Sequence, residues 1–95
     1  MRTIIYKKAF KKQFKLLLSR GKNMDKLKDA IELLAHDLLI PEFYKDHALT
    51  GNFVNFRDIH IEPDWILIYQ KREKTVEHPN GALLLESTGT HSDLF

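Results

Sequence analysis

Hydrophobic and polar positions change their spacing along the first part of the chain, and the change predicts two kinds of element. Residues 2–6 are rich in β-branched and aromatic side chains, which predicts a short strand at or near a sheet edge. From Lys8 onward, apolar residues recur at helical spacing and lysines fill the positions between them, which predicts an amphipathic, very basic helix. Gly21 is placed to end this helix, because glycine readily adopts the left-handed conformation of a C-cap.

A second helix is predicted to begin at Asn23, which is a favourable N-cap. Its apolar positions keep the helical period for about four turns; they are Met24, Leu27, Ile31, Leu34, Ala35 and Leu38. Pro41 is expected to close it, because helices usually end before a proline. Two amphipathic helices with so short a link should form an antiparallel hairpin, and a sheet can cover their apolar side.

Two extended stretches follow, and a tight turn joins them. Residues 53–61 predict a strand of mixed polarity, one face of which carries Asp58 and His60. Trp65–Tyr69 is an apolar run too short for a helix, which predicts a buried strand. The intervening Glu62–Asp64 predicts the turn, because proline fixes φ at a central turn position and aspartate tolerates turn geometry.

Polar segments separate these strands from the rest of the chain. Residues 42–52 have a loop composition, and Arg72–Gly81 is a polar linker that ends in a strong turn signal. Residues 82–88 then predict the final strand, and residues 92–95 a short tail. This order favours an α+β fold, with an N-terminal strand and an α-hairpin packed on a mainly antiparallel sheet. The 95 residues are expected to form one domain, 1–95.

Charge is distributed unevenly, although the formal net charge is only +2. Residues 1–30 hold ten Lys or Arg and two acids, a balance of +8, whereas residues 31–95 hold five basic residues and eleven acids, a balance of −6. This asymmetry indicates a partner rich in phosphate at the basic end, unless the basic helix simply presents a solvated face. The chain has no cysteine, signal peptide or bilayer-spanning apolar run, which excludes a disulfide scaffold and a zinc finger and predicts a soluble, cytoplasmic protein.

Four candidate chemical residues fall near the ends of predicted strands. His60 and Asp64 lie at the two ends of one turn, His47 shortly precedes a strand, and His91 shortly follows one. If the strands are neighbours in one sheet, three imidazoles and a carboxylate converge. Imidazoles accept and donate protons near neutral pH, so two of them can divide the work of base and acid. Cleavage of RNA without a metal needs such a set, together with groups that stabilise charge on the phosphoryl oxygens.

Each candidate also has a plain structural interpretation. His47 could be an ordinary loop residue, and His60 a hydrogen-bonded, half-buried strand residue. Asp64 could be only a turn former, and His91 a cap or tail residue. Trp65 is better interpreted as core than as a base-stacking platform, and Phe95 either frays or folds back onto a base. We interpret His36 and His78 as surface residues without function.

A resemblance to a known family rests on three segments: Tyr44–Leu49 with Gly51, Phe56–Tyr69, and Thr88–Phe95. They resemble the YafQ branch of the RelE-type bacterial toxins, the ribosome-dependent mRNA interferases of type II toxin–antitoxin pairs. The helical part is similar more loosely, so the resemblance covers nearly the full length. It implies a RelE-like, microbial ribonuclease-type fold and cleavage of mRNA in the ribosomal A site. The implied chemistry is metal-independent attack by the 2′-OH, which leaves a 2′,3′-cyclic phosphate.

The resemblance also implies site residues. The family's functional positions hold residues of the expected type: His47, His60, Asp64 and His91 as catalytic residues, and Phe95 with Trp65 beside it as substrate contacts. We expect His47 or His60 to act as base, His91 as acid, and Asp64 to orient an imidazole. Two basic residues are expected to contact phosphate, namely Arg57 and Lys45. Lysines of the first helix are then expected to bind ribosomal RNA: Lys7, Lys8, Lys11, Lys12 and Lys15.

The implied partners are a cognate antitoxin, which blocks the toxin, and the ribosome with its mRNA. Operator DNA is expected only through the complex with the antitoxin, and no cofactor, metal or membrane partner is expected. One departure from the family is the linker Arg72–Gly81, which looks longer than the usual hairpin and is expected to affect contacts with the ribosome or antitoxin more than chemistry.

Two other function classes compete with a metal-free nuclease. Histidines and an aspartate are also a ligand set, so a metal-dependent hydrolase is the first alternative, and activity that survives EDTA would argue against it. The second is a non-catalytic RNA-binding or operon-regulating subunit. The intact histidine and aspartate set argues against that second alternative.

Overall fold

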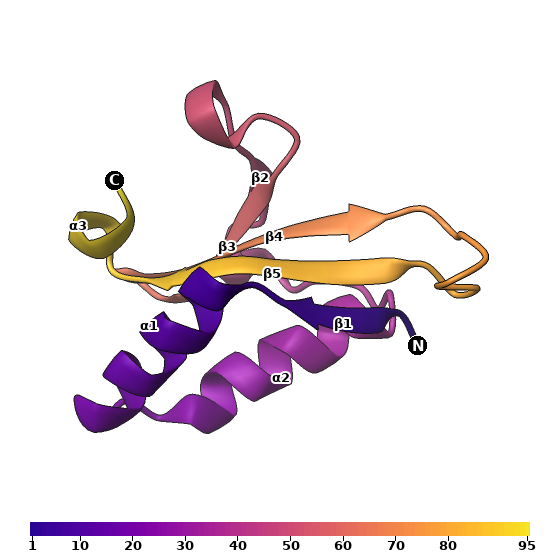
Figure 1. Cartoon of the computed structure of the whole chain (residues 1–95). Coiled ribbons are helices and arrows are strands. Elements are labelled where there is room, and N and C mark those ends of the chain that lie inside the picture. The colour runs from indigo at the N-terminus through magenta and orange to yellow at the C-terminus, as the bar shows by residue number, and fades with distance from the viewer.

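The helices and the sheet form two layers, as the computed structural model of residues 1–95 shows (Figure 1). The elements in chain order are β1 (Thr3–Tyr6), α1 (Lys8–Ser19), α2 (Met24–Ala35), η1 (Glu42–Tyr44), β2 (His47–Ala48), η2 (Gly51–Phe53), β3 (Arg57–Glu62), β4 (Trp65–Arg72), β5 (Ala82–Gly89) and α3 (His91–Leu94), where η marks a 3-10 helix. The strands lie in the order β1-β5-β4-β3-β2. β1 is parallel to β5, and the other pairs are antiparallel. The predicted α+β fold, with its first strand at a sheet edge, is confirmed.

The link between the two long helices follows the predicted chemistry. Gly21 has φ +78°, and the N–H groups of Gly21 and Lys22 donate to the carbonyls of Leu18 and Leu17, which closes α1 in a Schellman motif. The Asn23 side chain then accepts a hydrogen bond from the Asp25 N–H at 3.1 Å and so caps α2. No helix is long and apolar enough to cross a membrane.

The end of α2 differs from the prediction. The helix stops at Ala35, so the expected extension through Leu38 is wrong, and Leu38 is exposed. Asp37 adopts φ +54°, which breaks the helical path. Its carboxylate accepts hydrogen bonds from Lys71 at 2.7 Å and Arg2 at 2.8 Å, and these lower the pKa of Asp37 to about 2. Contacts distant in sequence therefore end the helix before Pro41 can.

The core lies between the two long helices and one face of the sheet. Figure 1 shows α1 and α2 turning back at their link and lying together on that face. The core holds 15 buried residues, including Phe10 and Leu17 from α1, Leu27 and Leu34 from α2, and Ile59, Trp65, Leu67, Leu83 and Leu85 from the strands. The α-hairpin predicted from the apolar spacing is thus covered by the sheet.

The segment between η1 and β3 forms an arm that rises from the sheet (Figure 1). The predicted start of a strand at residue 53 is wrong, because η2 and a turn occupy this region and β3 begins at Arg57. Gly51 has φ +65° and Asn55 has φ +75°, and neither angle is compatible with an extended strand. β2 lies within the predicted loop, where it pairs His47 with Asp58 and Ala48 with Arg57.

The last residues form the short helix α3 instead of an irregular tail. A capping box starts it: the Thr90 hydroxyl accepts from the Asp93 N–H at 3.1 Å, and the Asp93 carboxylate accepts from the Thr90 N–H at 3.0 Å. His91 is therefore the first residue of a capped helix, which fixes its backbone directly after β5.

Candidate active site

Three imidazoles gather on the sheet face that points away from the two long helices. His47 comes from β2, His60 from β3 and His91 from the start of α3. The ring centroids of His47 and His60 are 6.1 Å apart, and those of His60 and His91 are 5.7 Å apart. β2 lies on one side of β3, and β5, which leads into α3, lies on the other. The structure thus brings the predicted histidines together, with His60 in the middle.

His47 is oriented by the backbone beside it. Its Nδ1 lies 2.8 Å from the carbonyl oxygen of Lys45, and Lys45 adopts the left-handed φ of +51° that aims this carbonyl at the ring. A neutral imidazole that donates from Nδ1 keeps its lone pair on Nε2. Because the ring is also half exposed, Nε2 is available to accept a proton from a substrate.

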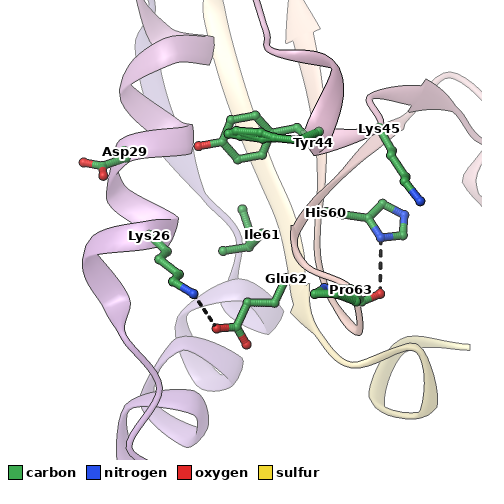
Figure 2. Close-up of a pocket in the computed structure, with 9 residues that line it drawn as sticks. Lys26, Asp29, Tyr44, Lys45, His60, Ile61, Glu62 and Pro63 are labelled. Carbon is green, nitrogen blue, oxygen red and sulfur yellow. Dashed lines mark hydrogen bonds and ion pairs between the residues drawn. The ribbon is translucent and has the colours of Figure 1, made fainter.

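His60 is held in a similar way by the turn that follows β3. Its Nδ1 lies 3.3 Å from the carbonyl oxygen of Pro63 (Figure 2). Figure 2 also shows that the His60 ring points away from α2, whereas the neighbouring Ile61 points toward it. A pocket of about 440 Å³ lies between α2 and β3, and His60 is the one member of the cluster that lines it. The three imidazoles therefore meet outside this pocket.

His91 is held by a carboxylate. Its Nδ1 lies 2.8 Å from Asp64 Oδ1, and the same oxygen accepts the His91 backbone N–H at 3.2 Å. The side-chain hydrogen bond from His91, followed by the backbone one, lowers the pKa of Asp64. A carboxylate that stays ionised next to an imidazole stabilises the protonated ring. Asp64 therefore orients His91 and gives its ring a charged hydrogen-bond partner.

Asp58 belongs to the cluster, although we did not predict it as a site residue. Its side chain is only 4% exposed, and Oδ1 lies 3.0 Å from His47 Nδ1. The Nδ1–H of the His47 ring is directed at the Lys45 carbonyl, so Asp58 Oδ1 accepts no hydrogen bond. Burial raises the pKa of Asp58, and the charges of the three histidines oppose this rise. The available sequence signal was its position on the same strand face as His60.

One part of the cluster has a geometry that a metal ion can use. A ligand atom from each of His47, Asp58 and His60 lies within 4.8 Å of the other two. Two imidazoles and a carboxylate suit Zn²⁺ or Cu²⁺. His91 and Asp64 are not members of this group.

Aromatic residues border the cluster on the side of α3. The Phe95 ring is exposed, lies 6.3 Å from the His91 ring and makes an edge contact with Phe53 of η2 at 5.6 Å. Trp65 differs: it is 0% exposed, and its indole N–H donates to the Thr88 hydroxyl at 2.9 Å. The expectation of Trp65 as a substrate contact is therefore wrong, because a buried ring offers no face to a base.

The predicted basic contacts lie in three places. Lys45 is exposed, and Figure 2 shows its side chain on the same side as the His60 ring. Arg57 instead donates to Asp46 at 3.1 Å, so the structure does not bring it to the imidazoles. The lysines of the basic segment are all exposed, and they belong to α1 and the residue before it, which contribute no side chain to the cluster: Lys7, Lys8, Lys11, Lys12 and Lys15.

Fold and site together define a small α+β protein with an exposed histidine–carboxylate cluster suited to proton transfer. The chain belongs to the YafQ family, because residues 2–95 match the model of the bacterial toxin of type II toxin–antitoxin systems, YafQ. It is 44% identical to the mRNA interferase toxin YafQ of Escherichia coli K12, covering 99% of this chain and 96% of that relative. The predicted toxin family and the endoribonuclease class are thereby confirmed at the level of the family.

Solved structures agree with this assignment. The chain resembles the toxin in the Escherichia coli DinJ-YafQ complex, with a TM-score of 0.84, 44% identity, and coverage of 100% of this chain and 99% of that one. It also resembles a copper-bound mutant toxin from Helicobacter pylori, with a TM-score of 0.88, 34% identity and complete coverage of both chains. The first of these relatives is bound to an antitoxin, and the second carries a metal.

Proposed function

We propose that this protein is a ribosome-dependent mRNA endonuclease, the toxin of a toxin–antitoxin pair, and that it cuts mRNA in the A site by metal-independent acid–base catalysis. The observation that carries the proposal is the unequal anchoring of the imidazoles. His91 is held by the exposed Asp64 carboxylate, whose pKa is lowered by the hydrogen bonds from His91. His47 Nδ1 instead lies between the Lys45 carbonyl and the carboxyl of Asp58, whose pKa is raised by burial, and His60 faces the Pro63 carbonyl. The family supplies the substrate class, since the Escherichia coli relative is an mRNA interferase.

The order of the rings supports a division of roles. In phosphoryl transfer the attacking and leaving oxygens lie roughly in line through phosphorus, so the base and the acid belong at opposite ends of the cluster. His47 Nε2 takes the proton of the 2′-OH, and the 2′-oxygen forms a bond to phosphorus. The bond from phosphorus to the 5′-oxygen breaks, and the His91 imidazolium gives this oxygen a proton. The products are a 2′,3′-cyclic phosphate and a 5′-hydroxyl.

His60 and Asp58 serve the charge that develops between those two ends. His60 lies within 6.1 Å of both other rings, centre to centre, and this central position supports a role for it at the phosphate. His60, which has a ring nitrogen within 4.8 Å of a carboxylate oxygen of Asp58, donates to a phosphoryl oxygen in the transition state.

Further contacts complete the proposed function. Phe95 stacks on a base beside the cut, and Lys45 contacts phosphate next to His60. The basic face of α1 binds ribosomal RNA, where phosphate contacts give affinity without reading sequence. The protein acts in the cytoplasm as one domain and has a cognate antitoxin, as the DinJ-YafQ complex of the relative supports. Operator DNA is bound only by the toxin–antitoxin complex.

A metal has no part in the proposed reaction. An ion held by His47, Asp58 and His60 would occupy the base and the central imidazole, so the bound state is an inhibited one. The copper-bound mutant toxin from Helicobacter pylori, which this chain resembles, supports occupancy by such an ion. This function therefore predicts cleavage in EDTA, in contrast to a metal-dependent hydrolase.

The test is cleavage of a programmed mRNA on purified ribosomes, with ribosome-free reactions as controls. We expect one cut within the A-site codon, a 2′,3′-cyclic phosphate on the upstream product, and no cut without ribosomes. Ribosome binding by a folded protein without any cleavage would contradict the proposal and favour a non-catalytic subunit. Cleavage that EDTA abolishes would favour the metal-dependent alternative.

A further inference from the structure

We propose that Asp46, Arg57 and Tyr69 form a positioning unit for His47, in which Tyr69 and Arg57 hold the Asp46 carboxylate and thereby fix the segment that carries the base. The role of His47 as base rests on the proposed function. The positioning itself is a property of the folded protein and can be measured without ribosomes.

The segment around His47 has little regular structure to hold it. β2 is two residues long, lies at the sheet edge and pairs only with β3. On its N-terminal side Lys45 has φ +51°, and on its C-terminal side the chain leaves for η2 after one hydrogen bond from Leu49 N–H to the Phe56 carbonyl at 2.9 Å. A strand this short needs side-chain contacts to keep one position.

Asp46 supplies those contacts from the position next to His47. Its Oδ1 accepts the Tyr69 hydroxyl at 2.6 Å and Arg57 Nε at 3.1 Å. The first distance is typical of a strong hydrogen bond to an ionised carboxylate. Tyr69 is 2% exposed within the core, so one end of this bond is fixed by packing on the central part of the sheet. Asp46 therefore connects the edge segment directly to the core.

The strand register places the unit beside the catalytic row. Ala48 pairs with Arg57, and Arg57 pairs with Tyr69, so the three strands β2, β3 and β4 meet at this point. The adjacent pair in the ladder is His47 with Asp58. A shift of Asp46 consequently moves His47, the next residue. It changes both the contact of the His47 ring with the Lys45 carbonyl and the direction in which His47 Nε2 points.

The donors of the unit are suited to a permanent anchor. Burial and the hydrogen bond to Asp46 raise the pKa of Tyr69, so its hydroxyl keeps its proton at neutral pH. Asp46 likewise raises the pKa of Arg57. Arg57 thus acts on the reaction through His47, in place of the phosphate contact expected from the sequence.

The central variant is Tyr69→Phe, which keeps the ring in the core and removes only the hydroxyl. Tyr6→Phe is the matched control, because Tyr6 loses the same atom from β1 at the opposite sheet edge. We expect Tyr69→Phe to lower kcat by about tenfold to a hundredfold, as misplacement of a catalytic group does, while KM stays within about twofold. Asp46→Asn should show the same pattern, and Tyr6→Phe should match the wild type.

Two readouts separate positioning from a general loss of structure. The first is the ¹⁵N spectrum of the His47 imidazole without ribosomes: one Nδ1–H tautomer is expected in the wild type and a mixture in Tyr69→Phe. The second is the double variant with His47→Ala, in which Tyr69→Phe should cause no further loss of cleavage. An unchanged His47 spectrum in Tyr69→Phe would overturn the inference. So would an equal further loss in the His47→Ala background. If the ribosomal cleavage itself fails, the ¹⁵N result still decides the inference.

Discussion

The two ends of the histidine cluster hold the same side chain in different ways. At the arm, His47 Nδ1 lies 2.8 Å from the Lys45 carbonyl and 3.0 Å from Asp58, a buried carboxyl whose pKa is raised by burial. At the C-terminal helix, His91 contacts the Asp64 carboxylate, a charged group from a different turn. The groups beside Nδ1 decide what Nε2 does. A carbonyl and a buried carboxyl with a raised pKa favour a neutral ring that accepts a proton, whereas an ionised, exposed carboxylate stabilises a ring that has a proton to give. The difference teaches how one residue type supplies both base and acid.

The largest effects are expected from removing the imidazole at either end of the histidine cluster. We predict that His47→Ala and His91→Ala each lower the rate of ribosomal cleavage by about a hundredfold to ten-thousandfold, the usual contribution of a general acid or base. Both rings are about half exposed, so both variants should stay folded, with only a small change in thermal stability. Single-turnover cleavage and a melting curve measure the two quantities. Full activity of either variant would remove that residue from the reaction.

The next largest effect is expected from removing the charge of Asp64 while the His91 ring that it orients is kept. Asp64→Asn keeps the size of the side chain but removes the negative charge, and we expect cleavage to fall by about tenfold to a hundredfold. Glu62→Gln is the matched control, because Glu62 lies in the same turn region and pairs instead with Lys22 and Lys26. Equal losses of cleavage in both variants would mean that the conformation of the turn, and not the negative charge beside His91, supports the reaction.

Metal ions should distinguish the ends by binding to only one of them. We expect EDTA to leave cleavage unchanged and added Zn²⁺ or Cu²⁺ to inhibit it, because the ligand group contains His47, Asp58 and His60. Calorimetric titration should show binding that is lost in His47→Ala and kept in His91→Ala. Binding that depends on His91 instead would contradict the geometry.

The smallest predicted effect is on the acid titration of Asp64. Its pKa is lowered in the folded protein, chiefly by the hydrogen bond from His91. The stability gained from this pair is therefore present above the ordinary aspartate pKa and is lost as the pH falls through the lowered value. In His91→Ala the pKa of Asp64 should rise toward its ordinary value, which a ¹³C titration of the carboxyl measures. An unchanged titration curve would show that the pair contributes nothing.

The parts of the fold with a regular period could be predicted from the sequence. The helix ends at Gly21 and Asn23, the turn at Pro63 and the buried strand after it follow from spacing and turn chemistry. Each of these features depends on residues close together in the chain. They place His60 and Asp64 correctly, since both belong to one hairpin.

The arm could not be predicted, because its conformation depends on single residues and distant contacts. Asn55 at φ +75° and the two-residue β2 have no periodic pattern. Asp58 was missed as a site residue because a polar residue within a strand is ordinarily solvent-facing, whereas this one is buried under the imidazoles. Trp65 was assigned to the substrate from its place in a motif, and packing against the helices buries it.

The most direct test of the account uses a substrate that does not need the acid. In an mRNA whose scissile 5′-oxygen is replaced by sulfur, the leaving thiolate departs without a proton, because a thiol is a far stronger acid than an alcohol. We predict that this substrate restores the cleavage rate of His91→Ala to near that of the wild type on the same substrate and leaves His47→Ala inactive. Restoration of His47→Ala, or failure to restore His91→Ala, would contradict the assignment of base and acid to the two ends of the cluster.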